Sequence, residues 1–180
     1  NAMKNSYLNR FSAFDLILTS LIAAVGIAVK PIVGSFVRMV TMPIMMPAGA
    51  VAGIVYMFWV TLAAGLVRKH GALLLFGFVQ AVVALIFGYG SHGAASLMTY
   101  ILPMVVAEIV LILFAAPGGN NISSFLAGGL ANVTGAFLVN LVILRVPKEP
   151  LYYILSLSFV FGGIGGLFGF KAAKELRRFV

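Results

Sequence analysis

Residues Leu151–Phe170 read LYYILSLSFVFGGIGGLFGF, 20 consecutive positions without a charged side chain. A helix needs about 20 predominantly apolar residues to cross the hydrocarbon core of a bilayer. The stretch is therefore predicted to be a transmembrane helix. Its glycines form the overlapping pairs Gly162-x-x-x-Gly166 and Gly165-x-x-x-Gly169. Small residues at this spacing let another helix approach closely, and we expect these pairs to serve contacts inside the chain.

Five other apolar runs precede this one, and each is ended by Pro, Gly, Asn or charged residues, which commonly interrupt regular structure. They are Ala13–Val29, Ala48–Val67, Ala72–Phe87, Ala95–Ala115 and Ile122–Leu144. The sequence therefore predicts an all-α integral membrane protein with six transmembrane helices in one bundle. Residues 3–180 are expected to form this single domain, because Asn1 and Ala2 before Met3 are typical of a cloning scar.

The composition supports a membrane protein and argues against other classes. Of 180 residues, 62% are hydrophobic and 9% are charged, whereas a soluble domain carries about 25% charged residues. The net charge of +8 is divided among short clusters between apolar runs, which is typical of membrane topology rather than nucleic-acid binding. No Cys, phosphate-binding loop or metal-ligand spacing occurs. We therefore expect no catalytic residues, no metal and no cofactor.

The segment from Pro31 to Pro47 fits no span, because three prolines interrupt it. We predict a long outward loop between the first two helices. This loop would either cap the bundle or re-enter the membrane. The alternative is a short, Pro-kinked seventh helix, which would place the two termini on opposite sides of the membrane.

The Lys and Arg residues indicate the orientation, because cytoplasmic loops are enriched in them. With six spans, eight of the 12 basic residues fall on the side of the termini. These are Lys4, Arg10, Arg68, Lys69, Lys171, Lys174, Arg177 and Arg178, against Lys30, Arg38, Arg145 and Lys148. Both termini are therefore predicted to be cytoplasmic, in a multi-pass protein of a plasma membrane, most simply a bacterial one.

Polar side chains inside the spans are the candidate site residues, because burial in hydrocarbon is costly unless they have partners. Glu108 is the one acid well inside a span. It would either contact a ligand or carry a proton, or it would be a protonated group hydrogen-bonded between helices. Gln80, Asn132 and Asn140 can likewise contact a ligand or join helices through amide hydrogen bonds.

An outward-facing pocket is the second expectation. Asn140, Tyr100, Tyr152, Tyr153 and His92 all fall near the outer ends of spans. Aromatic faces with a few hydrogen-bonding groups suit a small, flat, mostly uncharged heterocycle. The ordinary interfacial belt of aromatic residues would also account for the tyrosines. In the outer segment, Arg38 would meet an anionic group or lipid headgroups.

A strip of small residues, Ser20, Ala24 and Ala28, recurs at every fourth position of the first span. Such a strip forms a flat face that another helix can approach closely. It serves either a partner protein or packing within the chain, which is the commoner use.

Together these features resemble the substrate-binding S components of energy-coupling factor (ECF) vitamin transporters. The nearest likeness is to the YkoE-type S component, which is linked to thiamine precursors such as hydroxymethylpyrimidine. The likeness rests on size, helix count, the small-residue strip, and the segments Arg68-Lys69-His70-Gly71-Ala72-Leu73 and Ala107-Glu108-Ile109-Val110.

The resemblance implies a membrane-embedded subunit that captures a vitamin or vitamin precursor outside the cell. Its partners would be a transmembrane T subunit, which the strip Ser20, Ala24 and Ala28 would contact, and two cytoplasmic ATPases. Glu108 would be the acidic contact in the pocket. Two other hypotheses stay open: a stand-alone secondary carrier that uses Glu108 as its proton site, and a membrane scaffold without a ligand.

Overall fold

The structure is a computed structural model that describes residues 11–44, 46–88, 95–143, 145 and 147–178. Six α-helices account for nearly all of these residues, which confirms the predicted all-helical class. The elements are α1 (Ala13–Thr41), the 3₁₀ turn η2 (Met42–Ile44), α2 (Ala48–Val67), α3 (Ala72–Ile86), α4 (Ala95–Leu113), α5 (Asn121–Phe137), the π-helical segment η3 (Leu138–Ile143) and α6 (Lys148–Leu176).

The helices differ in how readily they span a bilayer. Within the described ranges, α1, α2, α5 with the start of η3, and α6 are long and apolar enough to cross it. Helices α3 and α4 are apolar but shorter over their described lengths. The chain is thus a multi-pass membrane protein, and six crossings remain a prediction.

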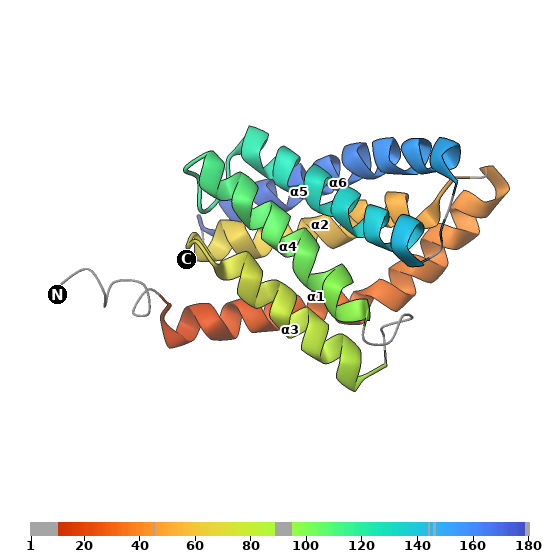
Figure 1. Ribbon diagram of the computed structural model, residues 1–180. Helices are drawn as coiled ribbons and strands as arrows, with labels where there is room; N and C mark the ends of the chain where they lie inside the picture. Colours follow the sequence, from red (N-terminus) through yellow and green to blue (C-terminus); the bar gives the residue numbers. More distant parts are fainter. Residues whose placement is uncertain (1–10, 45, 89–94, 144, 146, 179–180) are drawn as a thin grey trace.

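Helix α6 lies directly against α2 and α5, and its glycines make this approach possible (Figure 1). A Cβ added at Gly162 would lie 2.5 Å from Asn132 Cβ and 2.5 Å from the Gly128 carbonyl oxygen. One added at Gly165 would lie 2.8 Å from the carbonyl carbon of Ile54 and closer still to its carbonyl oxygen. The α6 glycine pairs therefore face helices of the same chain.

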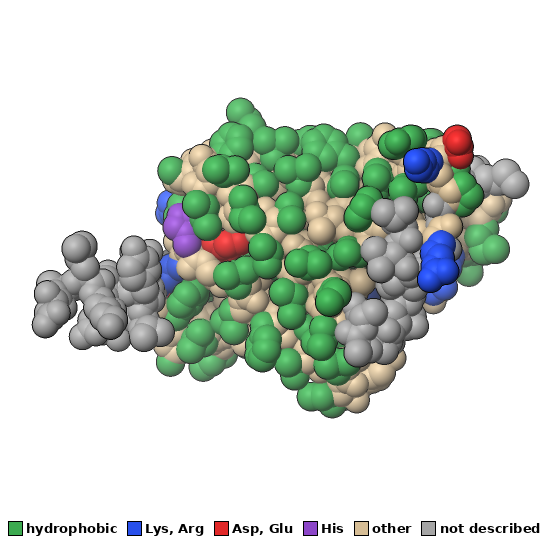
Figure 2. Space-filling view, in the orientation of Figure 1, with side chains coloured by type: hydrophobic (Ala, Val, Ile, Leu, Met, Phe, Trp, Pro, Cys, Tyr) green, Lys and Arg blue, Asp and Glu red, His purple; other side chains and the backbone are tan. Residues whose placement is uncertain are grey.

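The remaining helices complete the bundle around this group. Helix α4 packs against α5 and α3, and α1 packs against α2 and α3. Thr19, Ala23, Gly26 and Ile27 form the buried face of α1. Figure 2 shows hydrophobic side chains over the middle of the visible face, while charged side chains gather toward its two ends. This distribution matches a bundle that is surrounded by lipid along its length.

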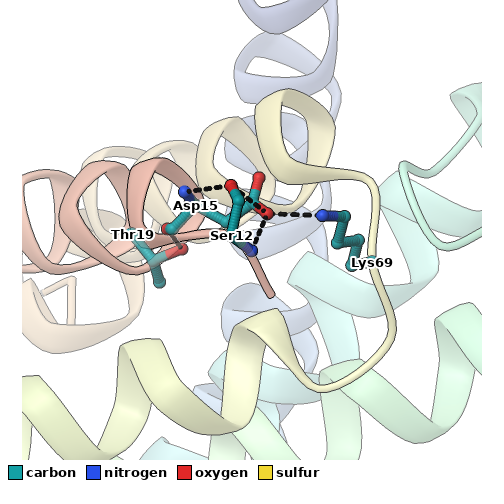
Figure 3. A network of polar contacts seen from close by, with 4 residues as sticks. All are labelled: Ser12, Asp15, Thr19 and Lys69. Atoms are coloured by element: carbon teal, nitrogen blue, oxygen red, sulfur yellow. Dashed lines mark hydrogen bonds and ion pairs between the residues drawn. The ribbon is translucent and has the colours of Figure 1, made fainter. Parts of the chain in front are cut away.

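The start of α1, the turn between α2 and α3, and the end of α6 lie at one end of the bundle (Figure 1). Ser12 caps α1 by accepting a hydrogen bond from Asp15 N at 3.1 Å. The Asp15 carboxylate in turn forms an ion pair with Lys69, which lies in the turn after α2 (Figure 3). Charge-assisted contacts of this kind hold α1 in register with its neighbours.

The predicted loop at residues 31–47 is wrong for most of its length, because α1 continues through Pro31 to Thr41. Proline removes one backbone N–H but sets a φ angle that a helix accepts. In an apolar environment, leaving the helix would expose many more backbone groups than the one that Pro31 removes. Ser35 Oγ also donates to the Pro31 carbonyl oxygen at 2.9 Å. The C-terminal part of α1 runs at an angle to the rest, toward the end of the bundle remote from the start of α1 (Figure 1).

Two glycine substitutions test the α6 contact. We expect Gly162→Ala to lower the free energy of unfolding by about 1–3 kcal/mol, because the added methyl group overfills a packed site. The matched control is Gly49→Ala, since a Cβ there meets nothing within 4 Å. Thermal unfolding of the detergent-purified protein measures both. Equal stability of the two variants would contradict the close α6 packing.

Candidate ligand-binding site

A cavity of about 490 Å³ lies in the half of the bundle remote from the start of α1. All six helices contribute to its wall. Its polar lining residues are Lys30, Tyr56, Gln80, Thr99, Tyr100, Asn132 and Asn140. Its apolar lining includes Met57, Val60, Pro103, Met104, Val139 and Ile154. A volume of this size and an apolar wall with a few polar groups are typical of a site for a small organic molecule.

Local departures from regular helix occur at the wall of the cavity. Pro103 lies inside α4 and lines the cavity. Helix α5 changes to π-helical geometry at Leu138, just before Asn140. Single π turns inside α-helices frequently occur at functional sites, because they change the direction of side chains. Asn140 Nδ2 donates to the Ala136 carbonyl oxygen at 2.8 Å, which fixes the amide beside the cavity.

The ammonium group of Lys30 is the one positive charge among the described lining residues. Its Nζ atom donates to Gln80 Oε1 at 3.2 Å and lies 4.1 Å from the centre of the Tyr100 ring and 5.1 Å from that of Tyr56. Gln80 is held in turn by its Nε2 atom, which donates to the Ala23 carbonyl oxygen at 3.3 Å. Side chains of α2, α3 and α4 thus surround the Lys30 ammonium group of α1.

Asn132 both joins helices and lines the cavity. Its Nδ2 atom donates to the Ala50 carbonyl oxygen at 3.2 Å and to the Ser158 carbonyl oxygen at 2.8 Å. It therefore links α5 to α2 and to α6. Gly53 provides the space for its amide, since a Cβ there would lie 2.5 Å from Asn132 Cγ. Asn132 thus joins helices, as one of the two alternatives from the sequence predicted, and its contact with a ligand stays a prediction.

The structure brings together four of the nine sequence-predicted site residues: Gln80, Tyr100, Asn132 and Asn140. His92 lies outside the described residues. Tyr152 and Tyr153 are 68% and 52% exposed and lie outside the lining, so their placement fits the aromatic belt at the membrane interface. Arg38 is exposed, and its Nε atom donates to the Gly34 carbonyl oxygen at 3.1 Å.

Glu108 is buried, but the structure places it outside the pocket, against the expectation from the sequence. Its carboxylate accepts hydrogen bonds from Gly71 N at 2.7 Å and from Leu73 N at 3.2 Å. His70 Nδ1 lies 3.4 Å from Glu108 Oε1. These are contacts to the N-terminus of α3, where backbone N–H groups lack partners in the helix and favour a negative charge. Glu108 thus caps a neighbouring helix.

Sequence reasoning missed Lys30 and Tyr56 as lining residues. The sequence predicts that the first span ends at Lys30, because a proline follows it and prolines commonly end helices. One signal could have identified Lys30 as a helix residue. It is a single Lys with apolar stretches on both sides, whereas a loop is usually polar over several residues. Tyr56 lies in the interior of an apolar span, and its OH group donates to the Lys30 carbonyl oxygen at 3.4 Å.

The small-residue strip of α1 lies at the edge of the buried face of this helix. Ser20 and Ala24 are half-buried and Ala28 is exposed. Their neighbours Thr19, Ala23 and Ile27 are fully buried. Packing within the chain therefore covers the strip only in part, and the remainder is accessible to another helix.

The fold is shared with a known class of transporter subunit. The chain matches a solved structure described as "Crystal structure of an S-component of ECF transporter" with a TM-score of 0.78 and 20% sequence identity, over 94% of this chain and 87% of that chain. At this identity the likeness establishes the fold.

The family follows from the sequence match. The family model "ABC-type cobalt transport system, permease component" matches residues 14–134. The chain belongs to this family of transport permease components. No curated protein sequence matches it significantly.

The placement of Glu108 gives a second prediction. Glu108→Ala leaves Gly71 N and Leu73 N without their acceptor, and a buried unsatisfied group costs about 1–3 kcal/mol. We expect a lower free energy of unfolding and unchanged occupancy of the pocket, measured by thermal unfolding and by ligand titration. The conservative variant Glu108→Gln retains an acceptor and should lose less stability. Weakened binding in a well-folded Glu108→Gln protein would contradict this assignment.

Proposed function

We propose that the chain is the substrate-binding subunit of an ECF-type ABC importer and captures a vitamin or vitamin precursor. The observation that carries this proposal is the cavity of about 490 Å³, lined by all six helices, within a fold shared with an ECF S component. Membership of a transport permease family supports it. The cavity has the size that a compound of one or two rings requires.

The orientation proposed for the membrane directs the pocket to the outside. The excess of Lys and Arg on the side of the termini predicts a cytoplasmic location for that end. The cavity lies in the opposite half of the bundle. In this arrangement the subunit takes up its substrate outside the cell. Inward delivery would use a transmembrane T subunit and two cytoplasmic ATPases, because the sequence has no phosphate-binding loop of its own.

The ligand that we favour is a small heterocycle, and hydroxymethylpyrimidine is the first candidate because of the YkoE-type resemblance. The amides of Gln80, Asn132 and Asn140 and the phenol of Tyr100 can donate to and accept from ring nitrogens and hydroxyl groups. Intact thiamine carries a fixed positive charge. That charge would meet the Lys30 ammonium group, so the pocket opposes it.

A cobalt ion fits this pocket poorly, although the family description mentions cobalt transport. Divalent first-row metals in proteins are bound by imidazole, thiolate and carboxylate groups. Within the part of the chain that the structure describes, no group of three or more His, Cys, Asp or Glu residues could hold a metal. The Lys30 charge would also repel a divalent cation.

A proton-coupled carrier that works through Glu108 has little geometric support. Its carboxylate is engaged with backbone N–H groups of the α2–α3 turn and of α3, and it does not line the cavity. A transported proton would need a route between Glu108 and the substrate. The binding-subunit proposal requires no such route.

The coupling surface that we propose is the strip Ser20, Ala24 and Ala28. Its side chains are small and partly accessible, and small residues let the backbone of another membrane helix come close. A helix of the T subunit is the partner that fits this surface.

A ligand panel tests the proposed function. Hydroxymethylpyrimidine, thiamine, riboflavin, biotin and cobalamin would be added to the purified protein, and thermal stability would be measured. A ligand that binds only the folded state stabilises it by about 2.7 kcal/mol at a hundredfold excess over its Kd. We expect Tyr100→Ala to abolish this stabilisation and Tyr152→Ala, on an exposed side chain, to retain it. Equal effects of the two substitutions would place the ligand elsewhere.

The coupling surface has its own test. Ala24→Leu combined with Ala28→Leu should abolish co-purification with a co-expressed T subunit and leave ligand stabilisation unchanged. Val25→Leu is the control, because Val25 is exposed beside the strip and already has a bulky side chain. Loss of both properties in the double variant would mean that the strip packs inside the chain.

A further inference from the structure

The pocket holds a cation for which the chain has no counter-ion. The sequence contains four acidic residues, and all of them lie in the described ranges. Asp15 pairs with Lys69, Glu108 binds the N-terminus of α3, Glu175 pairs with Arg178, and Glu149 is exposed in the first turn of α6. None of them lines the cavity around Lys30. A partly buried charge inside a bundle is costly unless an opposite charge or a set of hydrogen bonds compensates it.

The hydrogen bonds of Lys30 leave capacity for a ligand. An ammonium group has three N–H donors. Among the described residues, Gln80 Oε1 is the acceptor that Lys30 Nζ reaches. The rings of Tyr56 and Tyr100 attract the cation through their faces, but a neutral ring does not cancel a full charge. The remaining donors can therefore bind an anionic acceptor inside the cavity.

The surroundings fix the position of this ammonium group. Gln80 is anchored to α1 through the Ala23 carbonyl oxygen, and Tyr56 is anchored through the Lys30 carbonyl oxygen. The two rings and the amide thus hold the Lys30 head in one place. A positioned donor loses less entropy on binding than a mobile one, so the arrangement is suited to recognition.

The rest of the wall defines the other part of the ligand. Met57, Val60, Pro103, Met104 and Ile154 are apolar, so the body of the ligand that lies against them is apolar as well. We propose that the substrate is a small ring compound that carries one carboxylate, and that Lys30 binds this carboxylate. The inference rests on the proposed function and narrows its substrate class to acids, so it favours a ring carboxylate over the neutral hydroxymethylpyrimidine named first above.

A second basic residue supports an anionic ligand. Arg38 follows Lys30 by two helical turns, with Gly34 between them on the same face of α1. A Cβ added at Gly34 would lie 3.5 Å from the Tyr56 hydroxyl oxygen and 3.9 Å from Arg38 Nη2. Arg38 therefore lies on the Tyr56 side of α1 and is exposed. Its positive charge at the surface beside Tyr56 raises the local concentration of anions there.

Matched pairs of compounds test the inference on the purified protein in detergent. Each pair shares a ring and differs in charge: nicotinate and nicotinamide, biotin and its amide, and hydroxymethylpyrimidine with the corresponding pyrimidine carboxylate. Affinities are measured by titration calorimetry. In parallel, small molecules released by denaturing the purified protein are identified by mass spectrometry. We expect at least one acid, from the pairs or from the released material, to bind at least tenfold more tightly than its neutral analogue.

Substitutions of Lys30 then assign the preference to its charge. Lys30→Met should weaken binding of the acid at least tenfold and leave the neutral analogue unchanged, whereas Lys30→Arg should retain the preference. Melting temperatures confirm folding, and Lys30→Gln replaces any variant that does not fold. The comparison of acid with neutral compound in the unmodified protein needs no variant at all.

The possible failures are distinguishable. A neutral or cationic ligand that binds more tightly than its acid, with no effect of Lys30→Met, would overturn the carboxylate inference and leave the proposed function intact. An acid that binds equally well to Lys30→Met would also overturn it. If no compound binds and the denatured protein releases none, both the inference and the proposed function fail.

Discussion

The close contact of α6 with α2 and α5 is the constraint on which the structure depends. Between Gly162 and Gly169 the glycines bring the backbone of α6 against backbone atoms of α2 and α5, and Thr61 Oγ1 donates directly to the Gly166 carbonyl oxygen at 2.8 Å. Helices in lipid gain little from hydrophobic burial, so such close packing and direct hydrogen bonds hold them together. Nearer the start of α6, larger residues such as Ile154 replace glycine, and there the bundle encloses the cavity. Tight packing in one half of the bundle thus supports an open site in the other.

Much of the fold was predictable because apolar length is a strong signal. The starts of α2, α3 and α4 at Ala48, Ala72 and Ala95 agree with the predicted spans. The helix after Lys30 was not predictable in the same way. A proline that ends a helix in water can lie inside one in an apolar environment, because each backbone group that leaves the helix there needs another hydrogen-bond partner. Because the helix was predicted to end there, Lys30 was placed at the start of a loop and not among the residues that face the cavity.

The candidate site was predictable in part, because polar residues stand out within apolar runs. Gln80, Asn132 and Asn140 were predicted because polar side chains within apolar runs need partners, and Tyr100 because it falls near the outer end of a span. Glu108 obeyed this rule too, but its partners are backbone N–H groups of a helix end. A sequence shows that a buried carboxylate must be satisfied, and it does not show by what. Distinguishing a ligand from a helix N-terminus required the arrangement of α3 beside α4.

The continuity of α1 has a thermodynamic consequence. One hydrogen-bonded helix carries Ala28 of the exposed strip and Lys30 of the cavity, two residues apart. A partner that binds the strip and a substrate that binds the cavity would then act on the same rigid segment. If each prefers one position of that segment, the partner must change the affinity for substrate by the same factor by which substrate changes the affinity for the partner. Loading of the pocket and docking of the subunit would therefore be measured as a single coupled equilibrium.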